Sequence, residues 1–163
     1  MEILNISQNF EIKGGSDAYF KLLSNLLQDN GIIVKEFAAS LKNSEEYPKA
    51  IDFINPRIGD VIKYLYNREA EIKLERFLNK NRFNIAHLHI YYGKLTSSIL
   101  QPLKKKNIPI VQTLHEYKLV CPTYKLHDGN SLCKDCSGNN FYKSVFKKCN
   151  RGRETGCRSI VPA

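Results

Sequence analysis

The chain has 163 residues, a length that suits one domain of ordinary size. Its composition, with 42% hydrophobic and 25% charged residues, is typical of a soluble globular protein and excludes a disordered one. No apolar run approaches the ~20 residues that span a bilayer, and the first residues lack the regions of a signal peptide. We therefore expect a cytoplasmic protein, in which clustered cysteines bind metal more often than they form disulfides.

The net charge of +9 is unevenly distributed along the chain. Residues 1–93 carry 12 basic and 12 acidic side chains, whereas residues 94–163 carry 13 basic and 4 acidic ones. Such a basic part attracts phosphates, anionic lipid headgroups or nucleic acid through long-range Coulomb attraction. A solvated basic face without a specific partner explains the charge equally well, so both interpretations stay open.

The amino-terminal part of the chain predicts a strand–helix–strand unit. We expect strands over residues 2–7 and 32–37, with a helix between them. Ser16 and Asp17 are typical of a helix start, because a hydroxyl caps the first turn and a carboxylate meets the positive end of the helix dipole. The apolar residues of this helix recur at amphipathic spacing: Ala18, Leu22, Leu23, Leu26 and Leu27. The crossover of such a unit is right-handed.

Further helices and strands alternate in the middle of the chain. Residues 39–56 predict a loop because they have weak periodicity, and residues 58–80 predict one long helix. Strands are expected over residues 85–90 and 108–114, separated by a helix that Pro102 should distort or shorten. The nearly continuous apolar run of the last strand is typical of a sheet that helices cover on both faces.

These elements predict an α/β fold, a doubly wound, mostly parallel Rossmann-like sheet with a small cysteine-rich appendage. The pattern changes after residue 114 to cysteines, glycines and basic residues. We expect a Rossmann-like domain over residues 1–120, a cysteine-rich, metal-binding segment of the same domain over residues 121–152, and an atypical tail over residues 153–163.

Ligands of open parallel sheets bind outside the carboxyl ends of the strands, and three loops of this chain meet that condition. The first loop holds Gly14, Gly15 and Ser16. Paired glycines let a ligand approach the backbone, and the free amides of the following helix can bind a phosphate. Most Gly-Gly pairs are only turns, and the spacing is neither a dinucleotide fingerprint nor a P-loop.

Histidines mark the other two loops. His87 and His89 share one face of a predicted strand, where two histidines can bind metal, although a structural role is the more frequent one. We assign His87 a structural role, whereas His89, nearer the strand end, suits either packing or the site. His115 follows the next strand, where an imidazole can donate a hydrogen bond or transfer a proton near neutral pH. We favour a functional role for His115 over that of a loop cap.

The cysteines form the sharpest local pattern. Cys121, Cys133, Cys136 and Cys149 are spaced C-x11-C-x2-C-x12-C. The C-x2-C pair fits a tetrahedral metal and the flanking cysteines complete four thiolates, which predicts a structural zinc site. The segment is too small and polar to hold a core, and a bound zinc explains how it folds. An iron–sulfur cluster suits four thiolates as well, and Cys157 is left unassigned.

Three stretches together resemble glycosyltransferase family 4, in particular the amino-terminal domain of bacterial members. They are the run 14–17 before an amphipathic helix, the run 87–89, and the run 113–122 with the sequence TLHEYKLVCP. In those members a D-G-x-x-C-x-x-C segment follows, and this chain has it over residues 128–136. The resemblance covers nearly all of residues 1–152.

The resemblance implies the amino-terminal half of a GT-B fold, with the active site between two Rossmann-like domains. It implies retaining transfer from a nucleotide-diphosphate sugar to a glycan or lipid-linked acceptor, without a catalytic metal. The backbone of Gly14 and Gly15 would approach the donor diphosphate, and His115 would contact the transferred sugar and stabilise an oxocarbenium-like transition state. Further residues of these motifs complete the expected substrate-binding set: Ser16, Asp17, His89, Glu116 and Tyr117.

The chain departs from the family in one large respect. Family members continue into a carboxy-terminal domain that grips the nucleotide and the donor sugar, and we expect that domain to be missing from a truncated chain. The isolated chain should then have no useful transferase activity, because half of the transition-state contacts are absent. The basic part suits an acceptor carried on a lipid pyrophosphate, so peripheral contact with the anionic inner membrane surface is a further hypothesis.

Two other interpretations stay open. A zinc-binding basic module for nucleic acid or another polyanion also explains the cysteines and the charge. Nucleic acid is not the expected partner, however, because only Phe141 and Tyr142 approach the aromatic pattern of a stacking platform. A degenerate remnant that folds without activity is the third interpretation. Salt-sensitive DNA binding would favour the module, and low solubility would favour the remnant.

Overall fold

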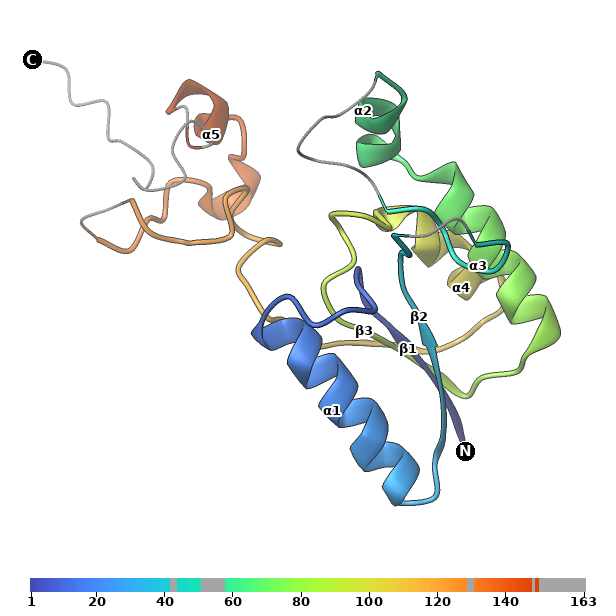
Figure 1. Cartoon of the computed structure of the whole chain (residues 1–163). Coiled ribbons are helices and arrows are strands. Elements are labelled where there is room, and N and C mark those ends of the chain that lie inside the picture. Colours follow the sequence, from blue (N-terminus) through green and yellow to red (C-terminus); the bar gives the residue numbers. More distant parts are fainter. Residues whose placement is uncertain (42–43, 51–57, 129–130, 148, 150–163) are drawn as a thin grey trace, which may run out of the picture. The chain divides into compact units, whose positions relative to one another are not determined.

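The computed structural model describes residues 1–41, 44–50, 58–128, 131–147 and 149 (Figure 1). The chain divides into two compact units, Met1–Thr113 and Leu114–Ala163, which we call the first and the second unit. The sequence places this division later, after residue 120. No helix in the described part of the chain is long and apolar enough to cross a membrane.

The first unit is built on a parallel sheet, which has four strands in the described residues. They are β1 (Glu2–Ile6), β2 (Ile33–Phe37), β3 (Ile85–Leu88) and β4 (Ile110–Gln112). Their order is β2-β1-β3-β4, and each neighbouring pair is parallel. The predicted α/β class and parallel sheet are therefore confirmed, with β3 and β4 shorter than predicted. This arrangement is consistent with a Rossmann-like fold.

Helices lie on both sides of this sheet (Figure 1). The helix α1 (Gly15–Asp29) connects β1 to β2 and lies on one side. On the other side lie α3 (Arg68–Lys80) and α4 (Leu100–Lys105). The short helix α2 (Ile58–Leu65) precedes α3, and a single turn of 3-10 helix, Ser97–Ile99, leads into α4.

The two faces of the sheet differ in polarity. Side chains alternate along a strand, so Asn5 points to α1, whereas Leu4 and Ile6 point to α3 and α4. The apolar core lies on the α3 side, and it contains large side chains with little or no exposed surface: Leu4, Ile6, Phe37, Leu74, Phe77, Leu88, Leu95, Ile99 and Leu103. Burial of each such side chain contributes roughly 1.5–3 kcal/mol, so this face dominates the stability of the first unit.

The helix α1 buries only part of the side that its leucines suggest. The residues turned to the sheet are Asp17, Phe20 and Ser24, which are 4%, 0% and 2% exposed. Leu22 and Leu26 are instead 67% and 56% exposed. Phe20 and Ser24 lie one helical turn apart. A buried serine cannot be predicted from the spacing of hydrophobic residues. Leu23 and Leu27 are half-buried, so the amphipathic spacing predicts the helix and only part of its buried face.

The single helix predicted over residues 58–80 is wrong, because it is broken into α2 and α3. Asn67 lies between them and is fully buried. Its Oδ1 caps α3 by accepting the N–H of Ala70 at 3.1 Å. Its Nδ2 donates to the carbonyl oxygen of Lys94 at 2.8 Å, and its N–H donates to Oγ1 of Thr96 at 3.0 Å. These bonds replace helical ones and fix the break.

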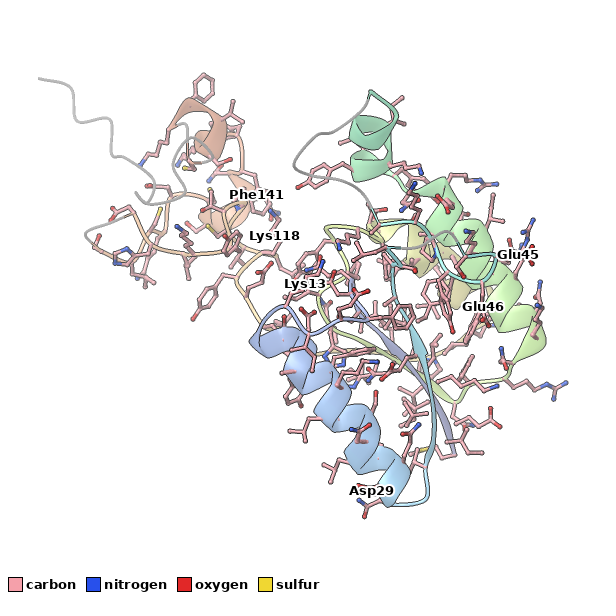
Figure 2. All side chains as sticks on the ribbon, in the orientation of Figure 1. Lys13, Asp29, Glu45, Glu46, Lys118 and Phe141 are labelled. Carbon is pink, nitrogen blue, oxygen red and sulfur yellow. The ribbon has the colours of Figure 1, made fainter. Side chains whose placement is uncertain are left out.

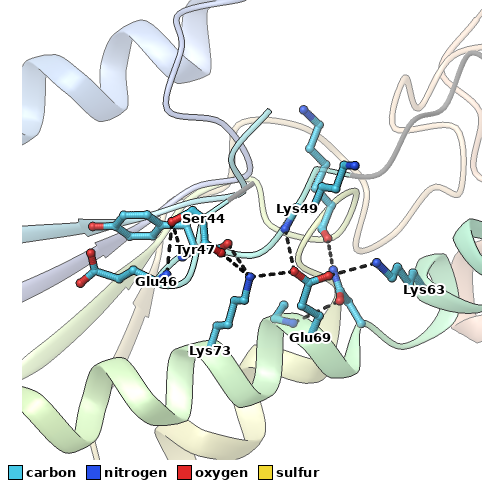
Figure 3. A network of polar contacts seen from close by, with 10 residues as sticks. Ser44, Glu46, Tyr47, Lys49, Lys63, Glu69 and Lys73 are labelled. Atoms are coloured by element: carbon cyan, nitrogen blue, oxygen red, sulfur yellow. Dashed lines mark hydrogen bonds and ion pairs between the residues drawn. The ribbon is translucent and has the colours of Figure 1, made fainter. Parts of the chain in front are cut away.

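A charged network connects α2 and α3 with the loop over residues 44–49 (Figure 3). Glu69 accepts hydrogen bonds from Nζ of Lys63 at 3.0 Å, Nζ of Lys73 at 2.9 Å and the backbone N–H of Lys49 at 3.1 Å. Lys73 also donates to two backbone carbonyl oxygens of the loop. Burial alone raises the pKa of Glu69, but these hydrogen bonds hold it at about 2.

The second unit has little regular structure in its described residues. A 3-10 turn covers Ser137–Asn139, the short helix α5 covers Lys143–Phe146, and an isolated bridge joins His127 to Leu132. Cys121 is the single buried residue among the described residues from 114 onward. Turns and backbone hydrogen bonds, and not an apolar core, therefore organise this part of the chain.

Candidate functional site

Two loops that follow β1 and β3 hydrogen-bond to each other. The N–H of Gln8, after β1, donates to the carbonyl oxygen of Ile90, after β3, at 2.7 Å. The strand order changes direction here, because β2 lies on one side of β1 and β3 on the other. Open parallel sheets bind ligands at such a switch point. We call this carboxyl end of the two strands the β1–β3 edge, and it is the candidate site of the first unit.

The glycine turn lies at the amino end of α1. The N-cap residue is Gly14 and not Ser16, so the predicted cap by a hydroxyl is wrong and no side chain caps the first turn of α1. A methyl group added at Gly14 or Gly15 would meet no described atom within 4 Å. Space beside the turn is therefore open to a ligand. The unpaired amides of a first helical turn, together with the helix dipole, favour an anion there.

Asp17 fixes the loop before α1 through hydrogen bonds of its buried carboxylate. Its carboxylate is buried and accepts hydrogen bonds from the backbone N–H of Lys13 at 3.1 Å and from Nδ2 of Asn9 at 3.3 Å. Oδ1 of Asn9 accepts in turn from Nζ of Lys94 at 2.6 Å. Asp17 thus lies beneath the loop and positions the glycine turn, whereas the half-buried Ser16 lies on α1 nearer solvent.

Two lysines bring positive charge to the same loops. Figure 2 shows Lys13 on the loop before α1, and Lys94 follows Gly93 on the loop after β3. Burial lowers the pKa of Lys94, and the charge of Lys13 lowers it further. Lys94 and Asn9 are not among the predicted site residues, because their contact joins residues 85 positions apart. No local motif signals such a contact.

His87 on β3 and His89, directly after that strand, lie on the side that points to α1, and their ring centroids are 4.5 Å apart. His89 is fully buried, and its Nε2 lies 2.8 Å from Oδ1 of Asn5. Nδ2 of Asn5 donates to Oγ of Ser24 on α1 at 2.8 Å. His87 bonds the hydroxyl of Thr113 at 2.8 Å. His87 and His89 share one face, as predicted. His89 is buried there, so it takes part in the packing of α1 against the sheet.

His115, Glu116 and Tyr117 belong to the second unit. His115 and Glu116 are half-buried, and Tyr117 is exposed. Burial raises the pKa of Glu116, and the nearby charge of Lys118 opposes that rise. The carbonyl oxygen of Tyr117 accepts the N–H of Cys121 at 2.8 Å, so this run leads directly into the cysteines. The expected catalytic histidine and the glycine turn therefore lie in different compact units.

All four cysteines of the expected metal site line one pocket of the second unit: Cys121, Cys133, Cys136 and Cys149. His127 and Asp135 line the same pocket, although the cysteine spacing singles out neither of them. Cys149 is disulfide-bonded, whereas the other three are free thiols. Among the described residues, no three His, Cys, Asp or Glu side chains are gathered closely enough to hold a metal ion.

The thiols of this pocket have different surroundings. Sγ of Cys121 lies 3.2 Å from Oγ1 of Thr123. Burial alone raises the pKa of Cys121, but that hydroxyl and the backbone N–H groups of the following turn bring it below its usual value. Burial raises the pKa of Cys133, whose Sγ donates to Oδ2 of Asp135 at 3.2 Å. Asp135 is also ion-paired with Lys147.

No protein-family model, curated protein or solved structure matches this chain. Its function is therefore inferred from the residues of the two sites and from the sequence motifs that they contain. In the first unit, the β1–β3 edge offers backbone amides and lysines, which suit an anionic ligand. In the second unit, the pocket offers thiols and an imidazole, which suit a soft metal ion.

Proposed function

We propose that this chain is the amino-terminal, acceptor-side domain of a retaining glycosyltransferase with a doubly wound fold of the GT-B type. The donor is a nucleotide-diphosphate sugar, and the acceptor is a glycan or a lipid-linked sugar. One observation carries the proposal: the glycine turn leaves the amino end of α1 open at a switch point of the parallel sheet. The resemblance of residues 1–152 to glycosyltransferase family 4 supports it.

The groups around the turn suit a diphosphate. The first-turn amides of α1 can donate to phosphate oxygens, and Lys13 and Lys94 add charge-assisted hydrogen bonds. Asp17 positions the loop of Lys13, and Asn9 positions the side chain of Lys94, through the hydrogen bonds described above. Burial and the charge of Lys13 both disfavour the charged form of Lys94. A bound anion would favour that charged form and so offset the unfavourable energy. The two loops are therefore prepared for a negatively charged group.

Sugar transfer needs a group that contacts the reacting sugar. In this proposal, His115 donates a hydrogen bond to the transferred sugar and stabilises its oxocarbenium-like transition state, and Glu116 and Tyr117 belong to the substrate-binding set that the family resemblance implies. No metal ion takes part in this step. Enzymes of this type draw half of the transition-state contacts from a second domain.

The basic part of the chain suits an acceptor at the inner surface of a membrane. Residues 94–163 carry 13 basic and 4 acidic side chains, which attract anionic headgroups. Sedimentation with vesicles of anionic or neutral lipid checks this contact. We expect binding to the anionic vesicles alone, falling as salt rises, since exposed charges are screened. Binding that does not change with salt would contradict the membrane contact.

Gly15→Ala tests the proposed anion site. The structure has room for the added methyl group, so the fold should stay intact while the methyl occupies the space of the ligand. By calorimetry, we expect the affinity for pyrophosphate and for a panel of nucleoside diphosphates to fall at least about 10-fold, or roughly 1.4 kcal/mol. The midpoint of urea unfolding should be unchanged or slightly raised.

Lys94→Met should weaken the same binding, because it removes one of the two cations beside the turn. Lys104→Met is the matched control, since this exposed lysine lies at the end of α4. Equal affinity of Gly15→Ala and the unaltered chain would refute the anion site. An equal loss in Lys104→Met would show that binding follows net charge alone.

A second candidate function is that of a cysteine-bearing basic module that binds nucleic acid or another polyanion. The exposed rings of Phe141 and Tyr142 beside Lys143 favour it, because bases stack on exposed aromatic side chains. Fluorescence anisotropy with single-stranded DNA separates the two candidates. Tight binding that Phe141→Ala and Tyr142→Ala weaken would favour the module, whereas the transferase proposal expects these variants to behave like the unaltered chain.

A further inference from the structure

The second unit has no apolar core among its described residues. Cys121 is the single buried residue among those described from 114 onward. Large apolar side chains of this unit are exposed: Leu114, Leu119, Val120, Leu132, Val145 and Phe146. A segment of this size without a core needs a disulfide or a metal ion to fix its fold. The cysteine pocket is the one feature of the described unit that can supply such a link.

Backbone hydrogen bonds place three of the four cysteines. The N–H of Cys121 donates to the carbonyl oxygen of Tyr117 at 2.8 Å. The N–H of Cys133 donates to the carbonyl oxygen of Leu126 at 3.0 Å, and that of Cys149 to the carbonyl oxygen of Ser144 at 3.0 Å. Three separate turns thus bring thiols from distant positions to one pocket. Such convergence is what a multidentate cation site requires.

Two of these sulfur atoms have polar partners close by. Sγ of Cys121 lies 3.2 Å from Oγ1 of Thr123, and Sγ of Cys133 lies 3.2 Å from Oδ2 of Asp135. In both cases the partner belongs to the residue two positions after the cysteine. Outer partners of this kind orient a sulfur ligand toward a metal.

We propose that this pocket is a binding site for a tetrahedral, thiophilic divalent cation of the Zn²⁺ class. Cys121, Cys133 and Cys136 are three of its ligands, and Cys149 is the fourth once its disulfide is reduced. A phosphine or dithiol reductant supplies the two electrons, which with two protons convert that disulfide into two thiols. Each ligand thiol then loses one proton as it bonds the cation. The cation draws the four sulfurs to about 2.3 Å from itself.

The experiment titrates the full chain, reduced with a phosphine and stripped of metal, with Co²⁺ and then with Zn²⁺. We expect one Co²⁺ per chain, with the intense visible absorption of a tetrahedral site and the ultraviolet sulfur-to-metal band of thiolate ligands, both lost when Zn²⁺ displaces Co²⁺. Native mass spectrometry gives the stoichiometry. Absence of a stoichiometric site, or octahedral cobalt absorption, overturns the proposal. Iron with acid-labile sulfide in the purified chain also overturns it.

Single substitutions assign the ligands. Cys133→Ser and Cys136→Ser should each lower the Zn²⁺ affinity by more than about 100-fold, beyond the effect typical of outer residues. Cys157→Ser is the matched control, since Cys157 is not among the proposed ligands, and it should bind like the unaltered chain. Hydrogen exchange over residues 1–113 shows whether a variant has lost the fold of the first unit.

The fourth ligand is decided by a pair of variants. Cys149→Ser should weaken the ultraviolet sulfur-to-metal band by about a quarter, whereas His127→Ala should leave it unchanged. The reverse result would overturn the assignment of Cys149 and place the imidazole of His127 in the site. This proposal does not depend on the glycosyltransferase function, because metal binding is read without substrate and the anion affinity of the β1–β3 edge is read without metal.

Discussion

The two units of this chain fold by different means. The first unit sorts its residues by polarity, with an apolar face of the sheet under α3 and α4 and a polar face under α1. The second unit exposes large apolar side chains and gathers cysteines in a pocket. Stability in the first unit should therefore depend on buried volume, and in the second unit on the chemistry of sulfur.

The largest effect is expected from a cavity in the apolar core. Leu74 on α3 is fully buried, so Leu74→Ala should lower the free energy of unfolding of the first unit by about 3 kcal/mol. Phe146→Ala is the counterpart in the second unit, where the ring is 71% exposed. We expect less than about 0.5 kcal/mol there. Urea unfolding followed by circular dichroism measures both, and equal losses would refute the contrast.

An intermediate effect is expected from the helix break. Asn67→Ala removes the cap of α3 and leaves the carbonyl oxygen of Lys94 without its buried donor. We expect a loss of about 2 kcal/mol, from the cap and the unpaired group together. Asn30→Ala is the control, because Asn30 is exposed at the end of α1. Hydrogen exchange in the first turn of α3 should rise in Asn67→Ala alone.

The smallest effect is expected from Glu69, and it depends on pH. The pKa of this carboxyl is about 2 in the folded chain and near 4.5 when unperturbed. Because the folded pKa is the lower one, its stabilisation is present above pH 4.5 and is lost as the pH falls toward 2. The network is partly exposed, so solvent screening limits the effect to about 1 kcal/mol.

Glu69→Gln tests this linkage. Between pH 7 and pH 3, the difference in unfolding free energy between Glu69→Gln and the unaltered chain should shrink. A difference that stays constant with pH would assign the network a purely packing role. Glu75→Gln is the comparison variant, since the half-buried Glu75 on the same helix pairs with the exposed Lys105 at the surface.

The strands could be predicted from sequence because apolar runs bounded by polar residues have few other interpretations. The break at Asn67 was missed, although an asparagine followed by acidic residues in the first turn is a helix start. The periodic apolar residues on both sides outweighed that local signal. The polar part of the buried side of α1 was missed for a different reason. It is set by Asn5, whose hydrogen bonds to α1 place Ser24 inside.

The candidate sites divide in the same way. The glycine turn and the cysteines are local motifs, so spacing alone located them. Asn9, Lys94 and His127 became visible only in the fold, because each reaches its site through contacts that the sequence does not encode in one stretch. The role of Asp17 was also beyond the sequence, since a carboxylate near a glycine turn can face either the ligand or the loop.

The polar layer beneath α1 restricts how this helix can sit. Asn5 is bonded at once to the carbonyl oxygen of Phe20, the hydroxyl of Ser24 and the ring of His89. Sliding α1 along the sheet by one turn, about 5.4 Å, would separate all of these partners. Each orphaned group would cost roughly 1–3 kcal/mol away from water. A purely apolar interface would permit such sliding. The hydrogen bonds of Asn5 therefore fix the position of α1 on the sheet, and with it the position of the backbone amides in its first turn.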